Sequence, residues 1–289
     1  MPQIIQPTKS KHRVLIYGVP KGGKTRLATS LDWADEETWG KKALYFAWDA
    51  GSESLSSVRK ADREHLIVVT PEPKVKRIGK EEYLEMNPHE EAHLMATRDW
   101  KKELPDVGTI IWDTYTDTAV KLLRGYANAG ALSGAKGDQH ISVGTKGGDD
   151  YMAFPMIGDY AMTGLNLSQI LDSLFEQPLN IIVICHADIS NPNPEVSNVT
   201  FGGPATVGQK AIATIAGKFD NLFRTDKRTA KAPAKGVEYM VYTEGRGIWL
   251  GGMRTSDNCN PLPEFSLGSS EKVVDGADFW RKFTEIQRG

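Results

Sequence analysis

A glycine- and lysine-rich segment, GVPKGGKT at residues 18–25, carries the strongest chemical signal in the sequence. It matches the pattern G-x-x-x-x-G-K-[ST], in which glycines let successive backbone N–H groups point inward around a phosphate. Lys24 can reach the β- and γ-phosphates of a nucleotide, and the Thr25 hydroxyl can bind Mg²⁺. Because an apolar run precedes the segment and an amphipathic helix pattern follows it, we expect a phosphate-binding loop with ATP and Mg²⁺ as its cofactors. The residues predicted to contact the nucleotide are Gly18, Pro20, Lys21, Gly22, Gly23, Lys24, Thr25 and Arg26.

An aspartate at the end of a second apolar run is the predicted partner of the metal ion. The run TIIWD ends in Asp113, where a carboxylate can hold a water ligand of Mg²⁺. The next residue is Thr114 rather than glutamate, which disfavours ATPases that activate water from a tandem Asp-Glu pair. The predicted metal site therefore consists of Thr25 and Asp113.

Two further strand ends are predicted to act on the γ-phosphate. The run 42–49 ends in Asp49, which in a parallel sheet emerges near Lys24 and can orient the attacking water. Glu53 is the alternative for this role, and the sequence does not decide between the two carboxylates. His186 directly follows the last buried run and is predicted to contact the γ-phosphate and report its loss to the loop behind it.

Short apolar runs supply the strands that would position these residues. They occupy residues 13–18, 42–49, 65–70, 107–114 and 179–188. Such continuous apolar runs are typical of strands buried on both faces of a parallel sheet. Helical patterns lie between several of them, over residues 23–35, roughly 80–103, 115–127 and 160–176. The alternation predicts right-handed crossovers and an α/β fold with a mostly parallel sheet flanked by helices.

The pattern changes after residue 200. Residues 238–254 alternate and turn on glycines, which predicts an antiparallel hairpin that extends the sheet. Residues 275–287 predict a closing helix with Asp275 as its cap. We expect a single domain over residues 1–289 whose further parts are an N-terminal arm (1–12), two glycine-rich mobile loops (127–150 and 190–210) and a basic hairpin tip (224–236).

The composition excludes several classes of protein. The chain has 289 residues, of which 40% are hydrophobic and 25% charged, and its formal net charge of −2 excludes a uniformly basic nucleic-acid coat. Cys185 and Cys259 offer no disulfide framework. The sequence contains no signal-peptide core and no apolar stretch long enough to span a membrane, so we expect a soluble cytoplasmic protein.

The order of the loop, the carboxylate Asp49, the run 109–113 and the run 181–188 resembles the RecA-like P-loop ATPase core. Within that group the chain looks like bacteriophage RecA-like nucleotide-binding proteins, which include single-strand-annealing recombinases. The matching positions are Gly18, Pro20, Lys21, Gly23, Lys24 and Thr25 in the loop, then Pro204, Gly208, Lys210, Phe219, Asp220 and Arg254.

The resemblance implies that Arg254 reaches the ATP of a neighbouring subunit in an oligomer. The residues expected to take part in hydrolysis are then Lys24, Asp49, Asp113, His186 and Arg254. Two positions depart from the family pattern, because the family more often has glutamate at Asp49 and a basic residue at Met253. Both departures fit weak hydrolysis.

RecA-like cores bind single-stranded DNA through loops that follow their late strands, and basic and aromatic residues in such loops suit phosphates and bases. The candidate contacts are Lys136, Lys146, Phe201, Lys210, Arg224, Lys227, Arg228, Lys231 and Lys235. The resemblance therefore implies a DNA-dependent ATPase that forms a ring or filament on single-stranded DNA in phage recombination, annealing or repair. A single-strand-binding protein is an expected partner.

Two other classes of function remain open. One is a nucleotide-gated assembly or switch protein with weak ATPase activity and no DNA binding, which the near-neutral charge favours. The other is a DNA motor, such as a helicase or packaging ATPase, although little of the chain is left outside the core for an added domain.

Overall fold

The computed structural model describes most of the chain, with gaps. The described residues are 11–48, 55–56, 58–71, 74–78, 81–85, 88–133, 142–143, 152–190, 200–207, 211–230, 236–255, 260–269 and 275–288.

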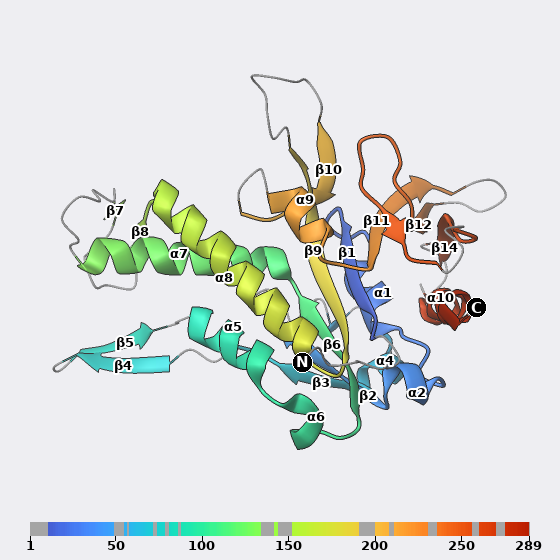
Figure 1. Ribbon diagram of the computed structural model, residues 1–289, viewed down its shortest axis with the longest axis horizontal. Coiled ribbons are helices and arrows are strands. Elements are labelled where there is room, and N and C mark those ends of the chain that lie inside the picture. The colour runs from blue at the N-terminus through green and yellow to red at the C-terminus, as the bar shows by residue number, and fades with distance from the viewer. Residues whose placement is uncertain are drawn as a thin grey trace, which may run out of the picture.

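A ten-stranded sheet forms the centre of the described structure (Figure 1). Its main path runs β14-β12-β11-β1-β9-β6-β2-β3, and β10 pairs with β9 while β13 pairs with β11. The bounds are β1 Arg13–Gly18, β2 Lys42–Ala47, β3 Leu66–Val69, β6 Val107–Asp113, β9 Asn180–Ser190, β10 Phe201–Pro204, β11 Asn221–Thr229, β12 Val237–Tyr242, β13 Gly252–Met253 and β14 Glu264–Ser269. Two smaller pairs lie outside this sheet: β4 Lys74–Ile78 with β5 Glu81–Glu85, and β7 Ser142–Val143 with β8 Met152–Ala153.

Six neighbouring strands of this path, in the order β11-β1-β9-β6-β2-β3, run parallel to one another. The side chains of β1 and β2 are almost all buried, and every residue of β6 is buried. Because β9 lies between β1 and β6, the strand that leads into the glycine-rich loop is separated from the strand that ends in Asp113. Both strands nevertheless end at the same edge of the sheet, where ligands bind in open α/β folds.

Helices cover the two faces of the sheet and create two separate apolar cores. One core packs α5 (Pro88–Thr97), α7 (Tyr115–Ser133) and α8 (Ile157–Glu176) on one face. The other packs α1 (Lys24–Thr29), α2 (Glu36–Trp39) and α10 (Ala277–Arg288) on the opposite face. The remaining short helices are α4 Lys60–Arg63, α6 Trp100–Glu103 and α9 Ala211–Ala216.

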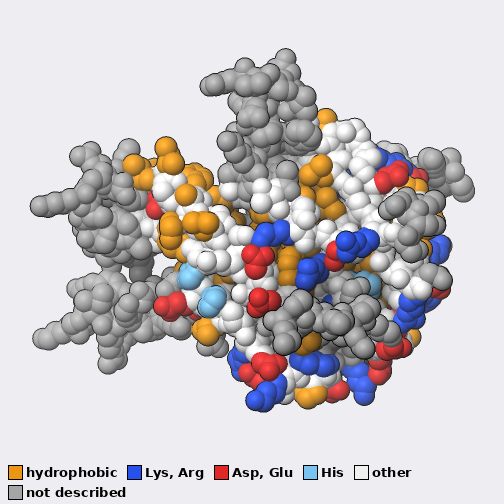
Figure 2. Space-filling view, in the orientation of Figure 1, with side chains coloured by type: hydrophobic (Ala, Val, Ile, Leu, Met, Phe, Trp, Pro, Cys, Tyr) orange, Lys and Arg blue, Asp and Glu red, His pale blue; other side chains and the backbone are white. Residues whose placement is uncertain are grey.

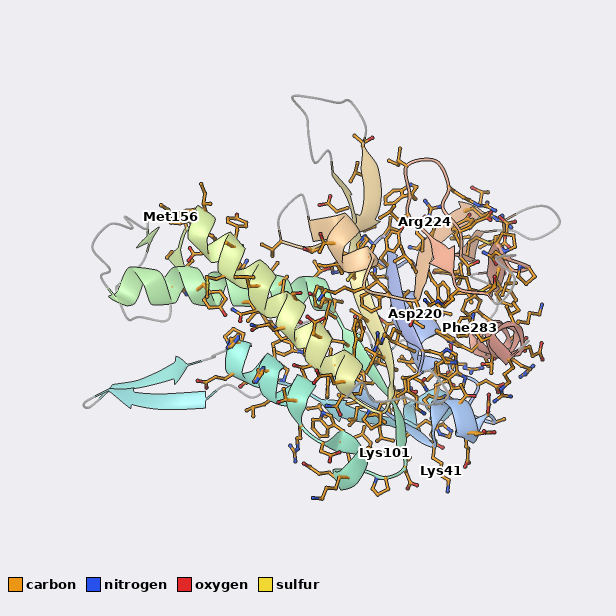
Figure 3. The ribbon with its side chains drawn as sticks, in the orientation of Figure 1. Lys41, Lys101, Met156, Asp220, Arg224 and Phe283 are labelled. Atoms are coloured by element: carbon orange, nitrogen blue, oxygen red, sulfur yellow. The ribbon has the colours of Figure 1, made fainter. Side chains whose placement is uncertain are left out.

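The aromatic cluster beneath α10 joins the end of the chain to its beginning. Phe279, Trp280 and Phe283 are completely buried, and the indole of Trp280 donates to the carbonyl oxygen of Leu27 at 2.7 Å. Figure 3 shows Phe283 on α10 beside the outer strands, and its ring meets that of Phe223 edge to face. This cluster fixes α1, and with it the glycine-rich loop, against the sheet.

The expected fold class is confirmed, because the sheet is mostly parallel, is flanked by helices and ends in an antiparallel extension. The closing helix is present, but it begins at Ala277, so Gly276 rather than Asp275 is its N-cap residue. The Asp275 carboxylate lies one position before this cap and accepts a hydrogen bond from the backbone N–H of Ala277 at 2.9 Å. No helix in the described part of the chain is long and apolar enough to cross a membrane.

Two element predictions are wrong. A single helix over 80–103 is replaced by β5, α5 and α6, because residues 81–85 pair with β4 in an antiparallel ladder. The helix predicted over 23–35 ends at Thr29, where the Ser30 hydroxyl donates to the Arg26 carbonyl oxygen and also accepts from the N–H of Gly276. The predicted antiparallel hairpin is present, but its strands are β11 and β12, and β13 pairs with β11 rather than with β12.

The first half of α8 presents an apolar face to solvent. Ile157 is 89% exposed, and Tyr160, Met162 and Leu165 are exposed as well. Figure 2 shows hydrophobic side chains gathered over this helix, beside atoms that are not described. Nothing within the described residues covers this face.

Replacing Phe283 with alanine tests whether the α10 cluster holds the fold together. We expect the free energy of unfolding to fall by about 3–5 kcal/mol, because a large buried aromatic side chain is lost. Chemical denaturation monitored by circular dichroism measures the change. Arg281→Ala is the control, because the Arg281 side chain on the same helix is 54% exposed and its ion pairs with Asp278 and Asp32 should together contribute about 1 kcal/mol or less. An equal loss in both variants would contradict this role of the cluster.

Candidate nucleotide site

The glycine-rich loop begins where β1 ends and closes at the start of α1. Lys21 and Gly23 adopt left-handed backbone conformations, with φ angles of 57° and 91°. Gly18 lies beside β11, and a Cβ atom there would come within 2.3 Å of the Thr225 carbonyl oxygen. Glycine is therefore required at position 18 by the close approach of a neighbouring strand as well as by the loop. Pro20 and Lys21 are exposed at the tip of the loop.

The ammonium group of Lys24 is buried inside the loop. Its Nζ atom donates to the carbonyl oxygens of Gly18 and Val19, each at 2.9 Å. Burial lowers the pKa of Lys24, and the negative charge of Asp113 opposes that change. A phosphate group placed in the loop would compensate the buried positive charge more fully than neutral carbonyl oxygens do.

Asp113 is almost completely buried and receives two hydroxyl donors on a single oxygen atom. Its Oδ2 accepts a hydrogen bond from the Thr25 hydroxyl at 2.8 Å and one from the Tyr45 hydroxyl at 2.5 Å. The hydroxyl of Thr25 and the carboxylate of Asp113 therefore meet as the predicted metal site requires. Hard oxygen donors of this kind are the ligands that Mg²⁺ prefers, directly or through water, so these residues fit the ion.

Tyr45 is a site residue that could not be selected from the sequence alone. It lies in the middle of the apolar strand β2, is completely buried and packs within the core beneath α1 and α10. A tyrosine in such a run is indistinguishable from a core residue until the register of β2 against β6 is known. That register places its hydroxyl beside Asp113.

His186 lies at the same edge of the sheet, directly opposite Gly18 in the register between β1 and β9. Its Nε2 atom is 3.6 Å from Oδ2 of Asp117, which stands in the first turn of α7. The neighbouring imidazole of His186, assisted by the hydrogen bond from the Thr114 hydroxyl, holds the pKa of Asp117 below its usual range. Asp117 was not selected from the sequence, because a helix-start aspartate carries no signal of its own.

The backbone at His186 is attached to the start of α7. Its N–H donates to the Thr116 hydroxyl at 3.0 Å, and that hydroxyl donates to the Ala205 carbonyl oxygen at 2.8 Å. The N–H of Ala205 in turn donates to the His186 carbonyl oxygen at 2.7 Å. Thr116 therefore links the helix after Asp113 to the base of the β9–β10 hairpin.

The carboxylate proposed to orient water lies outside the described residues, as does its alternative Glu53. The structure describes β2 up to Trp48, whose N–H donates to the Asp113 carbonyl oxygen at 2.6 Å. The ammonium of Lys121 on α7 donates to the carbonyl oxygen of Trp48. Asp49 thus follows a backbone position that is fixed beside Asp113.

Arg254 lies near the beginning of β11, whereas its own glycine-rich loop lies at the opposite, carboxyl end of the parallel strands. It follows Met253, which pairs with Asn221, whereas Gly18 pairs with Thr225 further along β11. Its guanidinium is 73% exposed and forms an ion pair with Asp220 at 2.7 Å. Figure 3 labels Asp220, directly before β11, and Arg224 within that strand, and shows them at different heights.

The prediction that Arg224, Lys227 and Arg228 form a loop tip is wrong, because all three lie within β11. Arg224 packs between the rings of Tyr242 and Trp249 and pairs with Asp226. Arg228 pairs with Glu238 at 2.7 Å and Glu264 at 3.8 Å. The positive charges of both arginines are therefore matched by carboxylates within the extension.

Of the six remaining residues predicted to contact DNA, the structure describes one. The backbone of Phe201 is placed in β10, where it pairs with Ser190. Five lysines lie outside the described residues: Lys136, Lys146, Lys210, Lys231 and Lys235.

Comparison with known proteins gives a family and a similar structure. A family model described as an AAA domain matches residues 10–255. None of the curated proteins matches the chain. Among solved structures, a KaiC-like protein from the hyperthermophilic archaeon Pyrococcus horikoshii is similar at 11% sequence identity, with a TM-score of 0.41 over 79% of this chain and 76% of that chain.

Tyr45→Phe tests whether the tyrosine hydroxyl orients Asp113 for the metal ion. We expect nucleotide affinity in Mg²⁺ to fall about tenfold, because a hydrogen bond to a charged group is lost, with no change of affinity in EDTA. Isothermal titration in the two buffers measures both values.

Tyr17→Phe is the matched control, because it removes a hydroxyl that donates instead to the Leu250 carbonyl oxygen. It should leave the ratio of the two affinities unchanged. If Tyr45→Phe also leaves this ratio unchanged, the hydroxyl plays no part in metal binding.

Proposed function

The chain belongs to the AAA domain family, and from this premise we propose that it binds and hydrolyses ATP with Mg²⁺ and acts on single-stranded DNA. The observation that carries the nucleotide part is the hydrogen bond from the Thr25 hydroxyl to Asp113. It joins the glycine-rich loop to the strand-end carboxylate across the intervening strand β9.

Each residue at this edge has a distinct task in the proposed reaction. Backbone N–H groups of the loop and the Lys24 ammonium bind the phosphate chain. Thr25 and Asp113 would hold Mg²⁺, which supplies positive charge to the β- and γ-phosphates. Asp113 stays oriented through its two hydroxyl donors.

The water that attacks the γ-phosphate needs an acceptor for its proton. Asp49 is proposed for this role, with Glu53 as the alternative, since both follow the fixed end of β2. His186 places its Nε2 atom 3.6 Å from Oδ2 of Asp117 and lies at the same end of the sheet as the loop. It is proposed to contact the γ-phosphate. When that phosphate is released, His186 would shift the β9–β10 hairpin through its link to Thr116.

The DNA part of the proposal rests on the position of that hairpin. β9 and β10 extend from the edge where the nucleotide would bind, and their base is tied to α7. Segments that follow the late strands are where RecA-like proteins contact single strands, as the resemblance implies. Assembly into a ring or filament is proposed as well, since Arg254 is exposed and lies away from its own loop. A phage role in recombination, annealing or repair follows from the resemblance alone.

A second function is a nucleotide-gated assembly or switch protein that binds no DNA. The observation that favours it is the pairing of Arg224 and Arg228 with carboxylates, which removes two of the expected DNA contacts. The formal net charge of −2 agrees with it. A DNA motor is a third hypothesis, and it would use the same nucleotide site.

The rate of ATP hydrolysis by the purified chain, with and without single-stranded DNA, separates these functions. We expect DNA to increase the rate, and Lys24→Ala to lower it by about 100-fold or more, because the cation at the phosphates is lost.

A rate that is measurable but unaffected by DNA would contradict the DNA part and support the assembly protein. A rate that survives unchanged in Lys24→Ala would contradict the nucleotide site itself. Circular dichroism of the variant checks that it is folded.

A further inference from the structure

The β11–β12 hairpin lies along one flank of the glycine-rich loop. Thr225 packs against Gly18, and a Cβ atom on Gly23 would lie 3.4 Å from the ring of Tyr239. In the register of the two strands, Lys227 is directly opposite Tyr239, and Thr225 is opposite Val241. Because side chains alternate along a strand, Thr225 and Lys227 share the face that meets the loop.

Lys227 differs in its charge environment from the arginines on either side of it. Arg224 and Arg228 both pair with carboxylates. The ammonium of Lys227 has no carboxylate partner among the residues that the structure describes, and it lies 5.9 Å from the centre of the Tyr239 ring. Burial lowers the pKa of Lys24 most, and the charge of Lys227 contributes a smaller lowering. An anion bound at the loop would therefore be attracted by both ammonium groups.

The position of Asp113 sets the direction in which a nucleotide would lie. Thr25 and Asp113 mark the end of the site that takes the metal and the terminal phosphates. Asp113 lies on the side of β1 where β9 and β6 follow, whereas β11 and β12 lie on the other side. A nucleoside triphosphate bound by its terminal phosphates at Asp113 would extend its nucleoside toward the hairpin.

We propose that Lys227 and Tyr239 form the wall of the site that contacts the nucleoside end of the bound triphosphate. The Lys227 ammonium binds the phosphate chain, and the Tyr239 ring packs against the nucleoside, as aromatic side chains do with flat rings. This inference rests on the proposed nucleotide function. It assigns Lys227 to the nucleotide instead of to DNA.

Comparison of ATP with inorganic tripolyphosphate tests the proposal, because tripolyphosphate carries the phosphates and no nucleoside. Both are titrated into the full-length chain in the presence of Mg²⁺. We expect Lys227→Met to weaken both ligands by about tenfold, and to reduce the dependence of binding on salt, since a phosphate contact is lost. We expect Tyr239→Leu to weaken ATP by about tenfold and leave tripolyphosphate unchanged. Tyr239→Phe, which keeps the ring, should bind both ligands as the unmodified chain does.

Lys282→Met is the matched control for the lysine. The Lys282 ammonium also lies over an aromatic ring, that of Phe265 at 5.1 Å, but on α10. This variant should bind both ligands normally. Thermal unfolding of each variant checks that the hairpin is intact.

The outcomes separate the two proposals. If Lys227→Met binds both ligands normally while Lys24→Ala binds neither, the inference is wrong and the nucleotide function stands. If Lys24→Ala also binds normally, the nucleotide function fails. If Lys227→Met lost affinity for single-stranded DNA alone, Lys227 would contact DNA and not the nucleotide, and the inference would be wrong. An equal loss of both ligands in Tyr239→Leu would show that the ring shapes the loop and does not contact the nucleoside.

Discussion

The buried carboxylate of Asp113 is the group on which the arrangement of the site depends. A buried charge is costly unless hydrogen bonds and opposite charges compensate it, and here three groups from two separate parts of the chain do so. Thr25 donates from the start of α1, Tyr45 donates from β2, and the positive charge of Lys24 lies nearby. Because β1 and β6 are not neighbours, this carboxylate is what joins the glycine-rich loop to the other half of the sheet.

The second constraint is the close packing of the loop between β9 and β11. Gly18 pairs with His186 on one side and with Thr225 on the other, and a Cβ atom at this position would overlap β11. The loop therefore cannot move sideways without displacing a strand. Its rigid position is supported from below by the aromatic cluster of α10, which holds α1 in place. A preformed loop of this kind loses little conformational freedom when a ligand binds.

Sequence reasoning predicted what depends on local pattern. The apolar runs gave the parallel strands, and the loop residues with Asp113 gave the core of the site, since each carries a signal within a few positions. It failed where the partner is distant in the chain. Tyr45 and Asp117 enter the site only through strand register and helix placement. The helix expected near residue 80 failed for the same reason, because residues 81–85 take their strand conformation from pairing with β4.

Strand alternation explains why the basic residues of β11 could not be assigned from their composition. Arg224 and Arg228 occupy one face, where rings and carboxylates of the extension enclose them. Lys227 stands between them in sequence, but its side chain belongs to the opposite face, beside the loop. A cluster read as a uniform basic patch is thus divided by the sheet into structural arginines and a lysine that faces the site. The position of a charge relative to the pleat, rather than the number of charges, decides which of them can meet a ligand.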